Sequence, residues 1–498
     1  MKILAFDIGT TSLKAALIDE NLEILDLVSK NAKIDFPKSG WAEIDLDNLW
    51  SDLCELSSKL DKLDSVDALI FAPHMAGVVP VDKEGNALMK AMIWLDERAA
   101  GYPKDLFSGI LKYAGYNIPK LMKFLRITGG GPSKTGKDPI SKILWLRDNE
   151  PEIFSKTAKM LDIKSYLIAR CCGVFVTSPD EATLTWLADT RGGVAKWSRS
   201  LLKNYRLDPN LFPEIKDSAS VAGEMKGNAC KDLGIKAKVI VGAGDLASAA
   251  VGSGAVKDGE AHIYAGTSDW VAAHIGKRIV DIPHYIGCLL SAIQRRYLLI
   301  AEQEIAGGAI EWAMKNLGID SYEEVESILK KGNILFLPWM CGERSPVDNP
   351  FLRGAILNLS LENDRGEVMN SVMEGIALNI KWAYLYFEKH AGRQESIRAI
   401  GGCMLFDKFC QMLADATKRP ILRLREPKYA GLRGAAAIAI VALLRESFEN
   451  VTKRFKVDKT FRPSDTERYD RLFRLFVESY KGLKNVYKSL NSQDYRKI

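Results

Sequence analysis

Short apolar runs separated by small polar turns open the chain and return about half a chain later. Lys2–Phe6 and Leu13–Ile18 are strand-like and flank the turn Gly9–Ser12. Ala261–Tyr264 and Trp270–Ile275 flank a second Gly-Thr turn in the same way. Short apolar runs bounded by turn residues are typical of buried strands, so the pattern predicts two related hairpins. We therefore expect a fold that is built twice.

The segments after the first hairpin alternate between strand and helix. Ile24–Ala32 and Ala68–Ala72 are strand-like, and between them Asp45–Leu60 is an amphipathic helix behind an acidic start. The first half closes with the buried strand Lys238–Gly242 and the small-residue helix Leu246–Val251. This alternation predicts an α/β architecture.

The second half restarts with its own hairpin and then becomes more helical. Its further predicted elements are the helices Glu304–Asn316, Arg365–His390, Phe406–Thr417, Leu432–Glu446 and Asp465–Leu490, the strand Ile397–Gly401 and the loop Pro338–Gly354. We expect the third and fourth of these helices to close the second core. Because no low-complexity linker separates the halves, we predict two domains, residues 1–245 and 246–498, with a hinge near 245–255.

Length and composition agree with this organisation. A chain of 498 residues is too long for one hydrophobic core, and 47% hydrophobic with 27% charged residues is ordinary for a soluble globular protein. The net charge of +6 is small and dispersed, which gives no support to nucleic-acid binding.

The cysteines and the apolar segments bear on the compartment. The eight cysteines form no C-x-x-C pair, and the adjacent Cys171 and Cys172 are poorly placed for an unstrained bridge. We expect reduced thiols in a cytoplasmic protein. Asp7 interrupts the apolar N-terminus, and no window approaches a membrane-spanning length, so neither a signal peptide nor a membrane contact is expected.

The two turns have the composition of phosphate cradles. Glycine lets successive N–H groups point at one anion, and hydroxyl side chains add further donors. The predicted donors are Thr10, Thr11 and Ser12 in the first turn, and Gly266 and Thr267 in the second. A nucleotide held between the halves would meet donors from both sides. Two ordinary hairpins with Gly-Thr turns are the alternative.

Two charged residues flank the first turn. Asp7 stands at a strand end, where a carboxylate can hold Mg²⁺ directly or through water. Its alternative role is to form the turn itself. Lys14 lies on the returning strand and is predicted to neutralise phosphate charge, with a solvated strand lysine as the alternative.

Asp245 follows a buried strand and precedes a helix of small residues. A carboxylate in the crevice at the carboxyl end of a strand is well placed to orient and deprotonate a hydroxyl during phosphoryl transfer. We predict that Asp245 is a general base. Simple helix capping requires the same residue type and is the alternative.

Three other signals are weaker. Residues 131–137 fit G-x-x-x-x-G-K, but Asp138 replaces the hydroxyl residue that holds Mg²⁺, so we expect a loop at a cleft rim rather than a P-loop. The five histidines show no ligand spacing that would indicate zinc. Gly401-Gly402 would let the chain approach a flat ring closely, although such pairs often only form turns.

Six motifs in order resemble those of the FGGY carbohydrate kinases, over nearly the whole chain. They are D-I-G-T-T-S-L-K at 7–14, W-L-D-E-R at 94–98, G-A-G-D at 242–245, A-G-T-S at 265–268, F-L-P-W-M-C-G-E-R-S-P at 336–346 continuing to Arg353-Gly354, and Gly401-Gly402 followed by Q-M-L-A-D at 411–415. The fifth is similar to the stretch of the xylulokinase and gluconokinase branch, and glycerol kinases usually lack its Gly-Glu-Arg.

The resemblance implies an α/β fold of two ribonuclease H-like domains, as in actin and hexokinase, with ATP and a sugar in the cleft between them. It implies Mg²⁺ as a cofactor and is compatible with a homodimer, since dimers are frequent in this family. The residues that fall where the family contacts adenosine are Gly307, Glu311, Gly402 and Phe406. Those in the sugar-site region are His74, Met75, Ala76, Trp94, Asp96, Arg98 and Asp245, although Trp94 could equally be core and Asp96 with Arg98 a structural ion pair.

Two departures affect the choice of sugar. Xylulokinases usually have Q-M-H-G where this chain has His74-Met75-Ala76-Gly77, and commonly an Asn where it has Leu246. Both changes remove hydrogen-bonding groups. On a strand, His74 would point to the same face as Ala76 and replace one missing contact.

We expect an ATP-dependent kinase that phosphorylates a primary hydroxyl of D-xylulose or a related ketose. A gluconokinase-like or polyol kinase is the alternative within the same class of enzyme. An actin-like or heat-shock-like ATPase that works as a binding switch is the alternative from another class, and it predicts ATP turnover that is indifferent to sugars.

Overall fold

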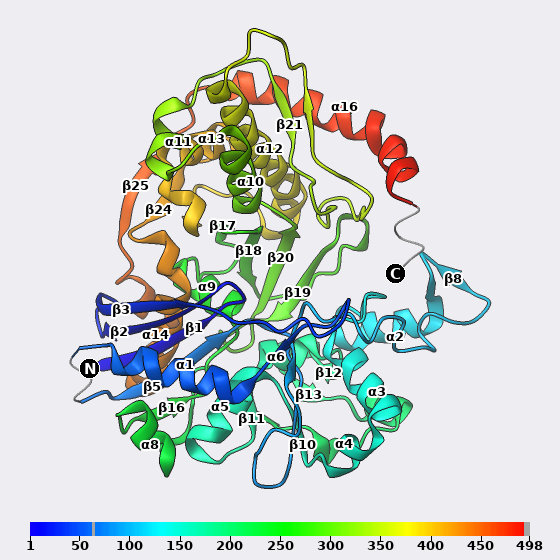
Figure 1. Cartoon of the computed structure of the whole chain (residues 1–498), viewed down its shortest axis with the longest axis vertical. Coiled ribbons are helices and arrows are strands. Elements are labelled where there is room, and N and C mark those ends of the chain that lie inside the picture. The colour runs from blue at the N-terminus through cyan, green and yellow to red at the C-terminus, as the bar shows by residue number, and fades with distance from the viewer. Residues whose placement is uncertain (62–64, 493–498) are drawn as a thin grey trace.

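The computed structural model describes residues 1–61 and 65–492, so the last six residues of the predicted second domain lie outside it. Two sheets organise the chain (Figure 1). The first has the order β15-β16-β5-β1-β2-β3. Its strands are β1 (Lys2–Ile8), β2 (Ser12–Asp19), β3 (Ile24–Asn31), β5 (Ala68–Pro73), β15 (Val221–Glu224) and β16 (Lys238–Ile240).

The second sheet has the order β19-β20-β18-β17-β23-β24-β25. Its strands are β17 (Ala261–Ala265), β18 (Asp269–Ile275), β19 (Ile286–Leu290), β20 (Tyr297–Gln303), β23 (Ile397–Ile400), β24 (Ile421–Leu424) and β25 (Val457–Phe461). β17 pairs antiparallel with β18 and parallel with β23, as β1 does with β2 and β5. The duplication expected from the two hairpins is therefore present in the topology.

Helices cover both sheets. In the first half they are α1 (Leu46–Ser58), α2 (Ile118–Thr128), α3 (Pro139–Asn149), α4 (Pro151–Lys156), α5 (Ile163–Cys172), α6 (Pro179–Leu184), α7 (Arg199–Tyr205), α8 (Asn228–Leu233) and α9 (Asp245–Gly252). In the second half they are α10 (Gly307–Leu317), α11 (Tyr322–Ile328), α12 (Arg365–Ala391), α13 (Asp407–Thr417), α14 (Ala430–Leu444), α15 (Phe448–Thr452) and α16 (Thr466–Asn491). The predicted helix at Glu304 begins three residues later, because β20 extends to Gln303.

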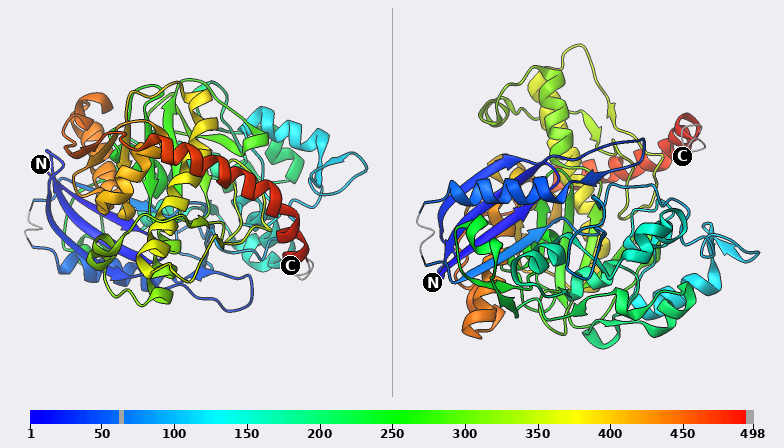
Figure 2. Two further views of the ribbon diagram at one scale, coloured as in Figure 1. Left: turned by 90° about the horizontal axis from the view of Figure 1, so that it is seen from above. Right: turned by 60° about the horizontal axis from the view of Figure 1, so that its bottom comes forward.

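Short strands and 3₁₀ turns complete the chain. The strands are β4 (Glu43–Ile44), β6 (Val79–Val81), β7 (Ala91–Met92), β8 (Lys112–Tyr113), β9 (Tyr116–Asn117), β10 (Lys159–Leu161), β11 (Val176–Thr177), β12 (Ala188–Asp189), β13 (Lys196–Trp197), β14 (Glu214–Ile215), β21 (Leu335–Leu337) and β22 (Ala355–Leu357). Figure 2 shows α16 lying across the outside of the second half. All eight cysteines are free thiols.

The position of helix α14 differs from the expectation that it closes the second core. Instead of closing the second core alone, it packs against α9 and against β1 and β5 of the first sheet. The two helices touch through their backbones, since a Cβ on Gly434 would lie 1.8 Å from the Ser248 carbonyl oxygen, and one on Gly252 would lie 1.8 Å from that of Ala430. A helix that is apolar on most of its circumference has to be buried on more than one side. The halves therefore share a helical layer between the sheets.

The same helix changes the expectation about membrane-length segments. Residues 427–444 are long and apolar enough, on composition, to cross a membrane, although the sequence was expected to contain no such window. In this window 61% of the residues are buried inside the protein. Such burial is typical of the core helix of a globular protein.

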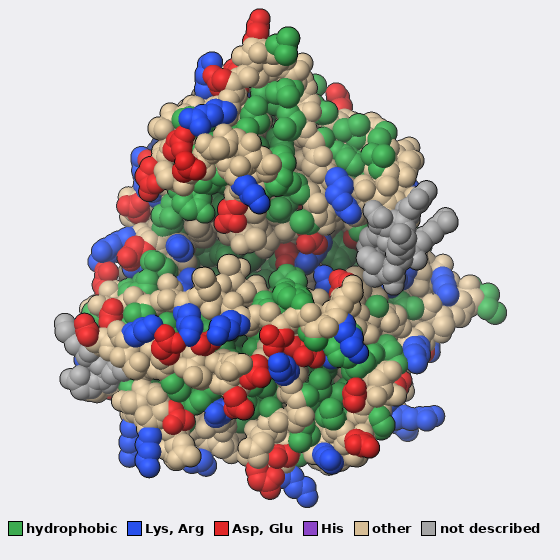
Figure 3. All heavy atoms as spheres, in the orientation of Figure 1, with side chains coloured by type: hydrophobic (Ala, Val, Ile, Leu, Met, Phe, Trp, Pro, Cys, Tyr) green, Lys and Arg blue, Asp and Glu red, His purple; other side chains and the backbone are tan. Residues whose placement is uncertain are grey.

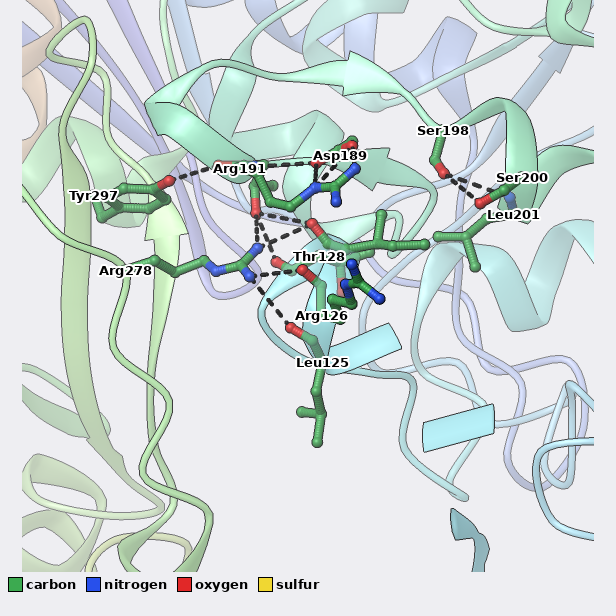
Figure 4. Close-up of polar contacts among 12 residues, drawn as sticks. Leu125, Arg126, Thr128, Asp189, Arg191, Ser198, Ser200, Leu201, Arg278 and Tyr297 are labelled. Carbon is green, nitrogen blue, oxygen red and sulfur yellow. Dashed lines mark hydrogen bonds and ion pairs between the residues drawn. The ribbon is translucent and has the colours of Figure 1, made fainter. Parts of the chain in front are cut away.

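A second contact joins the halves through Arg278, which follows β18 (Figure 4). Its guanidinium donates to the carbonyl oxygens of Arg126 and Ile127 at the end of α2, at 2.7 and 2.9 Å, and to the Thr190 hydroxyl at 2.9 Å. Nearby, the Tyr297 hydroxyl donates to the Thr190 carbonyl oxygen at 2.6 Å. A cation is favourable beside the free carbonyls of a helix C-terminus. The second half thus caps a helix of the first.

We expect Arg278→Ala to lower the free energy of unfolding by about 2 kcal/mol, because hydrogen bonds from a charged group to partly buried carbonyls are lost. Thermal melting of the purified variant measures this loss. Lys277→Ala, at an exposed neighbouring position, is the control and should melt like the wild type. Equal melting temperatures for all three proteins would show that the contact contributes nothing.

Candidate active site

The first predicted phosphate turn lies at the carboxyl end of β1. Gly9 closes it by donating its N–H to the Ser12 carbonyl oxygen at 3.0 Å. Thr10 and Ser12 are half-buried, and Thr11 is exposed. The surface is hollowed between the two halves of the molecule (Figure 3).

The second turn is bound to the start of a helix. Gly266 donates its N–H to the Ser268 carbonyl oxygen at 2.9 Å and accepts from the N–H of Gly307 at 2.7 Å. Gly307 is the first residue of α10, and Thr267 is exposed beside it. The structure thus brings together a turn and a helix N-terminus, both of which suit phosphate oxygens.

The residues expected around adenosine also gather here. A Cβ on Gly307 would lie 2.5 Å from the Gly266 carbonyl oxygen. A Cβ on Gly401, whose φ is 101°, would lie 2.3 Å from the Ala265 carbonyl oxygen. Around Gly402, in contrast, no atom lies within 4 Å of the Cβ position. Only glycine permits the first two approaches, so the close crossing of these segments explains the glycines.

Glu311 and Phe406 are linked through a residue that the sequence analysis missed. The Tyr322 hydroxyl donates to Glu311 Oε1 at 3.5 Å, and its ring makes an edge contact with buried Phe406 at 5.7 Å between centroids. No sequence pattern singled out Tyr322, because its proximity to Phe406 arises from tertiary packing.

Asp245 is the first residue of α9 and is half-buried. Its Oδ1 accepts from the N–H of the next residue, Leu246, at 2.7 Å, and Gly244 rather than Asp245 is the N-cap. Helix capping therefore does not explain the carboxylate. Burial, reinforced by the negative charge of Asp7, raises the pKa of Asp245 to about 7. Such a pKa suits a general base near neutral pH.

Asp7 and Lys14 face each other across β1 and β2. Their side chains form an ion pair with 3.0 Å between Lys14 Nζ and Asp7 Oδ2. Both are half-buried. The structure therefore places Lys14 on the carboxylate, from which it can still offer further N–H donors toward the adjacent turn.

A buried group of charges behind Asp245 was not predicted. Asp180 Oδ2 accepts from the N–H of Gly244 at 2.8 Å, and Lys164 donates to the Ser178 hydroxyl and to the Gly242 carbonyl oxygen. Burial, together with neighbouring carboxylates, raises the pKa of Glu181 well above its usual value. These contacts fix the segment that carries Asp245. In the sequence, the only indication of this group is the pair of adjacent acidic residues, Asp180 and Glu181, that follows Ser178-Pro179.

The segment at 74–76 differs from expectation. β5 ends at Pro73, so His74 and Ala76 lie in a loop, and Ala76 has a positive φ of 61°. The alternation of a strand therefore does not apply, and the prediction that the two side chains share a face for that reason was wrong. The buried Lys142 ammonium donates to the Ala76 carbonyl oxygen at 3.0 Å and fixes the loop.

His74 is buried, with 4% of its surface exposed, and neither ring nitrogen has a hydrogen-bond partner among the described residues. Burial and the positive charge of Lys142 lower its pKa to about 4, so the ring is neutral near pH 7. Next to it, Met75 packs on Gly244, where a Cβ would lie 2.2 Å from Met75 Cγ. The sugar-site segment and the segment of the predicted base therefore touch.

Asp96 and Arg98 have the geometry of a structural ion pair. Asp96 is fully buried, accepts from the Ala42 N–H at 2.7 Å and is bridged by the Arg98 guanidinium. Arg98 also pairs with Glu43 at 2.6 Å and stacks on Trp41 at 3.6 Å. These contacts occupy both groups and support the structural alternative.

Trp94 is half-buried, with the Lys137 ammonium 6.0 Å from its ring centroid. Lys137 belongs to the G-x-x-x-x-G-K loop, which joins α2 to α3. A P-loop follows a strand, whereas this loop follows a helix. Asp138 instead accepts from the Trp186 indole at 2.6 Å. The loop therefore contacts the Trp94 region without being a P-loop.

Leu246 belongs to a small apolar cluster between α9 and the second sheet. It packs with Trp270 and Ile300 against Ala250, Ala272 and Leu298. The leucine at the position where xylulokinases commonly have Asn therefore contributes to packing.

Two family models match the chain. The N-terminal domain of the FGGY family of carbohydrate kinases matches residues 2–252, and the C-terminal domain of the same family matches residues 261–443. The chain belongs to the FGGY family. It is therefore an ATP-dependent carbohydrate kinase, and its two-domain actin- and hexokinase-type fold is confirmed.

Relatives span the whole chain. A xylulose kinase of Lactococcus lactis is 26% identical over 506 residues, which cover 97% of each chain. A gluconokinase of Bacillus subtilis is 24% identical and covers 99% of this chain and 98% of its own. The crystal structure of ligand-bound xylulose kinase from Lactobacillus acidophilus has a TM-score of 0.85 at 26% identity, covering 98% of this chain and 99% of that one. Similarity of this kind confirms the xylulokinase and gluconokinase branch.

Proposed function

We propose that this FGGY kinase transfers the terminal phosphoryl group of ATP to a primary hydroxyl of D-xylulose or a related ketose. The observation that carries the proposal is the position of Asp245. Its carboxylate, with a pKa of about 7 that the charge of Asp7 helps to raise, stands at the start of α9, next to Gly244, on which Met75 of the sugar-site segment packs. The names of several relatives support xylulose as the sugar.

In this mechanism Asp245 accepts the proton of the attacking hydroxyl. The bond between that oxygen and the γ-phosphorus forms as the bond to ADP breaks, and the loose transition state needs positioning and charge stabilisation. The amides and hydroxyls of Thr10, Thr11 and Ser12 would supply the first set of donors. The amide and hydroxyl of Thr267 would supply the second, in the turn that Gly266 closes with its own N–H.

The residues present fit Mg²⁺. Asp7 lies close enough to Asp245 for its charge to raise the pKa of Asp245, and Lys14 pairs with only one of these two carboxylates, which leaves negative charge to be balanced. Over residues 1–61 and 65–492, no three acidic, His or Cys side chains converge as a metal site. Mg²⁺ is commonly held by one or two carboxylates with waters and phosphates, and Asp7 would be the first of these ligands. Bound there, it would neutralise phosphate charge.

The substrate is tested by a coupled ATP-consumption screen across pentuloses, hexuloses, aldonates and polyols. We expect the highest kcat/KM with D-xylulose or another ketose. Preference for gluconate would support the gluconokinase-like alternative, which has relatives of similar identity, and preference for a polyol would support the polyol alternative. ATP consumption indifferent to every sugar would support the actin-like switch.

We propose a cytoplasmic enzyme whose partner is a small sugar rather than nucleic acid or membrane. A homodimer is compatible with the family.

We further propose that residues 1–245 and 246–498 close on their ligands, with α9 and α14 as the shared hinge element. Because both halves supply phosphate contacts, sugar and ATP together should reduce the radius of gyration more than either ligand alone. Small-angle scattering on the Asp245→Asn variant allows both ligands to be present without turnover. Identical dimensions with and without the pair would contradict closure.

A further inference from the structure

Tyr264 lies on β17, two residues before the second phosphate turn, and no motif drew attention to it. Its ring stacks on Trp270, directly opposite on β18, with 3.8 Å between centroids and 7° between planes. Both residues pack against the layer of α9 and α14. This stack fixes the direction in which the phenol points.

The hydroxyl of Tyr264 lies at Gly266. A Cβ on Gly266 would be only 2.3 Å from the Tyr264 hydroxyl oxygen, so this position has to be glycine for the phenol to reach the turn. Gly266 is also the residue whose carbonyl accepts from Gly307 at the start of α10. The phenol therefore ends where the second turn and the helix N-terminus meet.

The Tyr264 hydroxyl has no hydrogen-bond partner within the described part of the chain. The tyrosine is half-buried, and a tyrosine hydroxyl in such a place normally has a partner. Burial, together with the negative charges of Asp7 and Asp245, raises its pKa. The group is thus a neutral O–H donor near both carboxylates.

We propose that the Tyr264 hydroxyl donates a hydrogen bond to the phosphoryl group during its transfer from ATP to the sugar. The bond from the γ-phosphorus to ADP breaks, the bond to the sugar oxygen forms, and Asp245 takes the sugar proton. Tyr264 keeps its own proton throughout. The inference rests on the proposed function, and it adds a catalytic residue on the side of the second domain.

A donor aimed at charge that develops in the transition state affects kcat more than substrate affinity. A purely structural tyrosine would act through its stack on Trp270. Tyr264→Phe separates the two roles, because it keeps the ring and removes only the hydroxyl. We expect kcat to fall about 100-fold, with KM values for sugar and ATP and the melting temperature nearly unchanged.

A second measurement reports on the transition state without turnover. With sugar present, the affinity for ADP plus aluminium fluoride, which mimics the transferring phosphoryl group, should fall at least tenfold in Tyr264→Phe, whereas the affinity for ADP alone should not change. Tyr480→Phe, in α16, is the matched control, because its ring packs on Trp339 and Trp382 and on none of the predicted site residues.

Wild-type kcat and wild-type affinity for the ADP–fluoride complex in Tyr264→Phe would overturn the role of Tyr264. An equal loss of affinity for ADP alone would also overturn it, since the contact would then belong to ground-state nucleotide binding. Absence of sugar-stimulated turnover in the wild-type protein would instead contradict the proposed function itself.

Discussion

Asp245→Asn should retain the fold and nucleotide binding and lose turnover by up to about 10⁴-fold, the range expected when a general base is removed. The amide cannot accept the proton of the sugar hydroxyl. The fold should survive because the side chain caps no helix, and an amide oxygen can still accept from the Leu246 N–H. Steady-state kinetics and nucleotide titration on the purified variant measure the two effects.

The pH dependence supplies an independent check of the same assignment. Because the active form of Asp245 is the carboxylate and its pKa is raised to about 7, kcat/KM of the wild-type enzyme should rise with pH through this region. The residual activity of Asp245→Asn should lack this limb. Asp258→Asn, which removes an exposed carboxylate paired with Arg296, is the control. Turnover like that of the wild type in folded Asp245→Asn would contradict the role of Asp245 as general base.

His74→Ala should raise the KM for the preferred sugar roughly tenfold or more, because one buried hydrogen bond is worth on the order of 1–3 kcal/mol. The expectation rests on the unpartnered ring nitrogens of His74 and not on strand geometry. A buried, neutral imidazole with two unpartnered nitrogens beside the Met75–Gly244 contact is suited to a sugar hydroxyl. The KM for ATP should hardly move.

His262 provides a matched control, because it is also buried and its ring nitrogens have no partner in the described chain. It lies in β17, within the second sheet. His262→Ala should therefore lower the melting temperature without a selective effect on the sugar. An unchanged sugar KM with a lowered melting temperature in His74→Ala would contradict a contact between His74 and the sugar and would favour a core histidine.

The sequence predicted those elements whose pattern is local. The two hairpins were predictable because short apolar runs alternate with Gly-Thr turns, and the observed β1–β2 and β17–β18 pairs follow them. Asp7, Asp245 and Gly266 were predictable as candidates for the same reason, since each stands beside a strand end. Their roles stay predictions until the variants are measured.

Features that depend on tertiary packing were missed or misplaced. The apolar pattern of α14 says that it is buried but not against which sheet. The end of β5 at Pro73 and the positive φ of Ala76 three residues later, which is unusual for its residue type, leave no trace in composition. The bond from Gly244 to Asp180 joins residues 64 positions apart, and the stack that directs Tyr264 becomes visible only in the folded hairpin.

The most direct test of the account is to follow ADP and sugar phosphate together in one reaction of the wild-type protein with ATP, Mg²⁺ and D-xylulose. We expect equimolar ADP and a sugar monophosphate esterified at a primary hydroxyl, with little ADP formed when the sugar is omitted. ADP that accumulates at the same rate without sugar, and without any sugar phosphate, would contradict it.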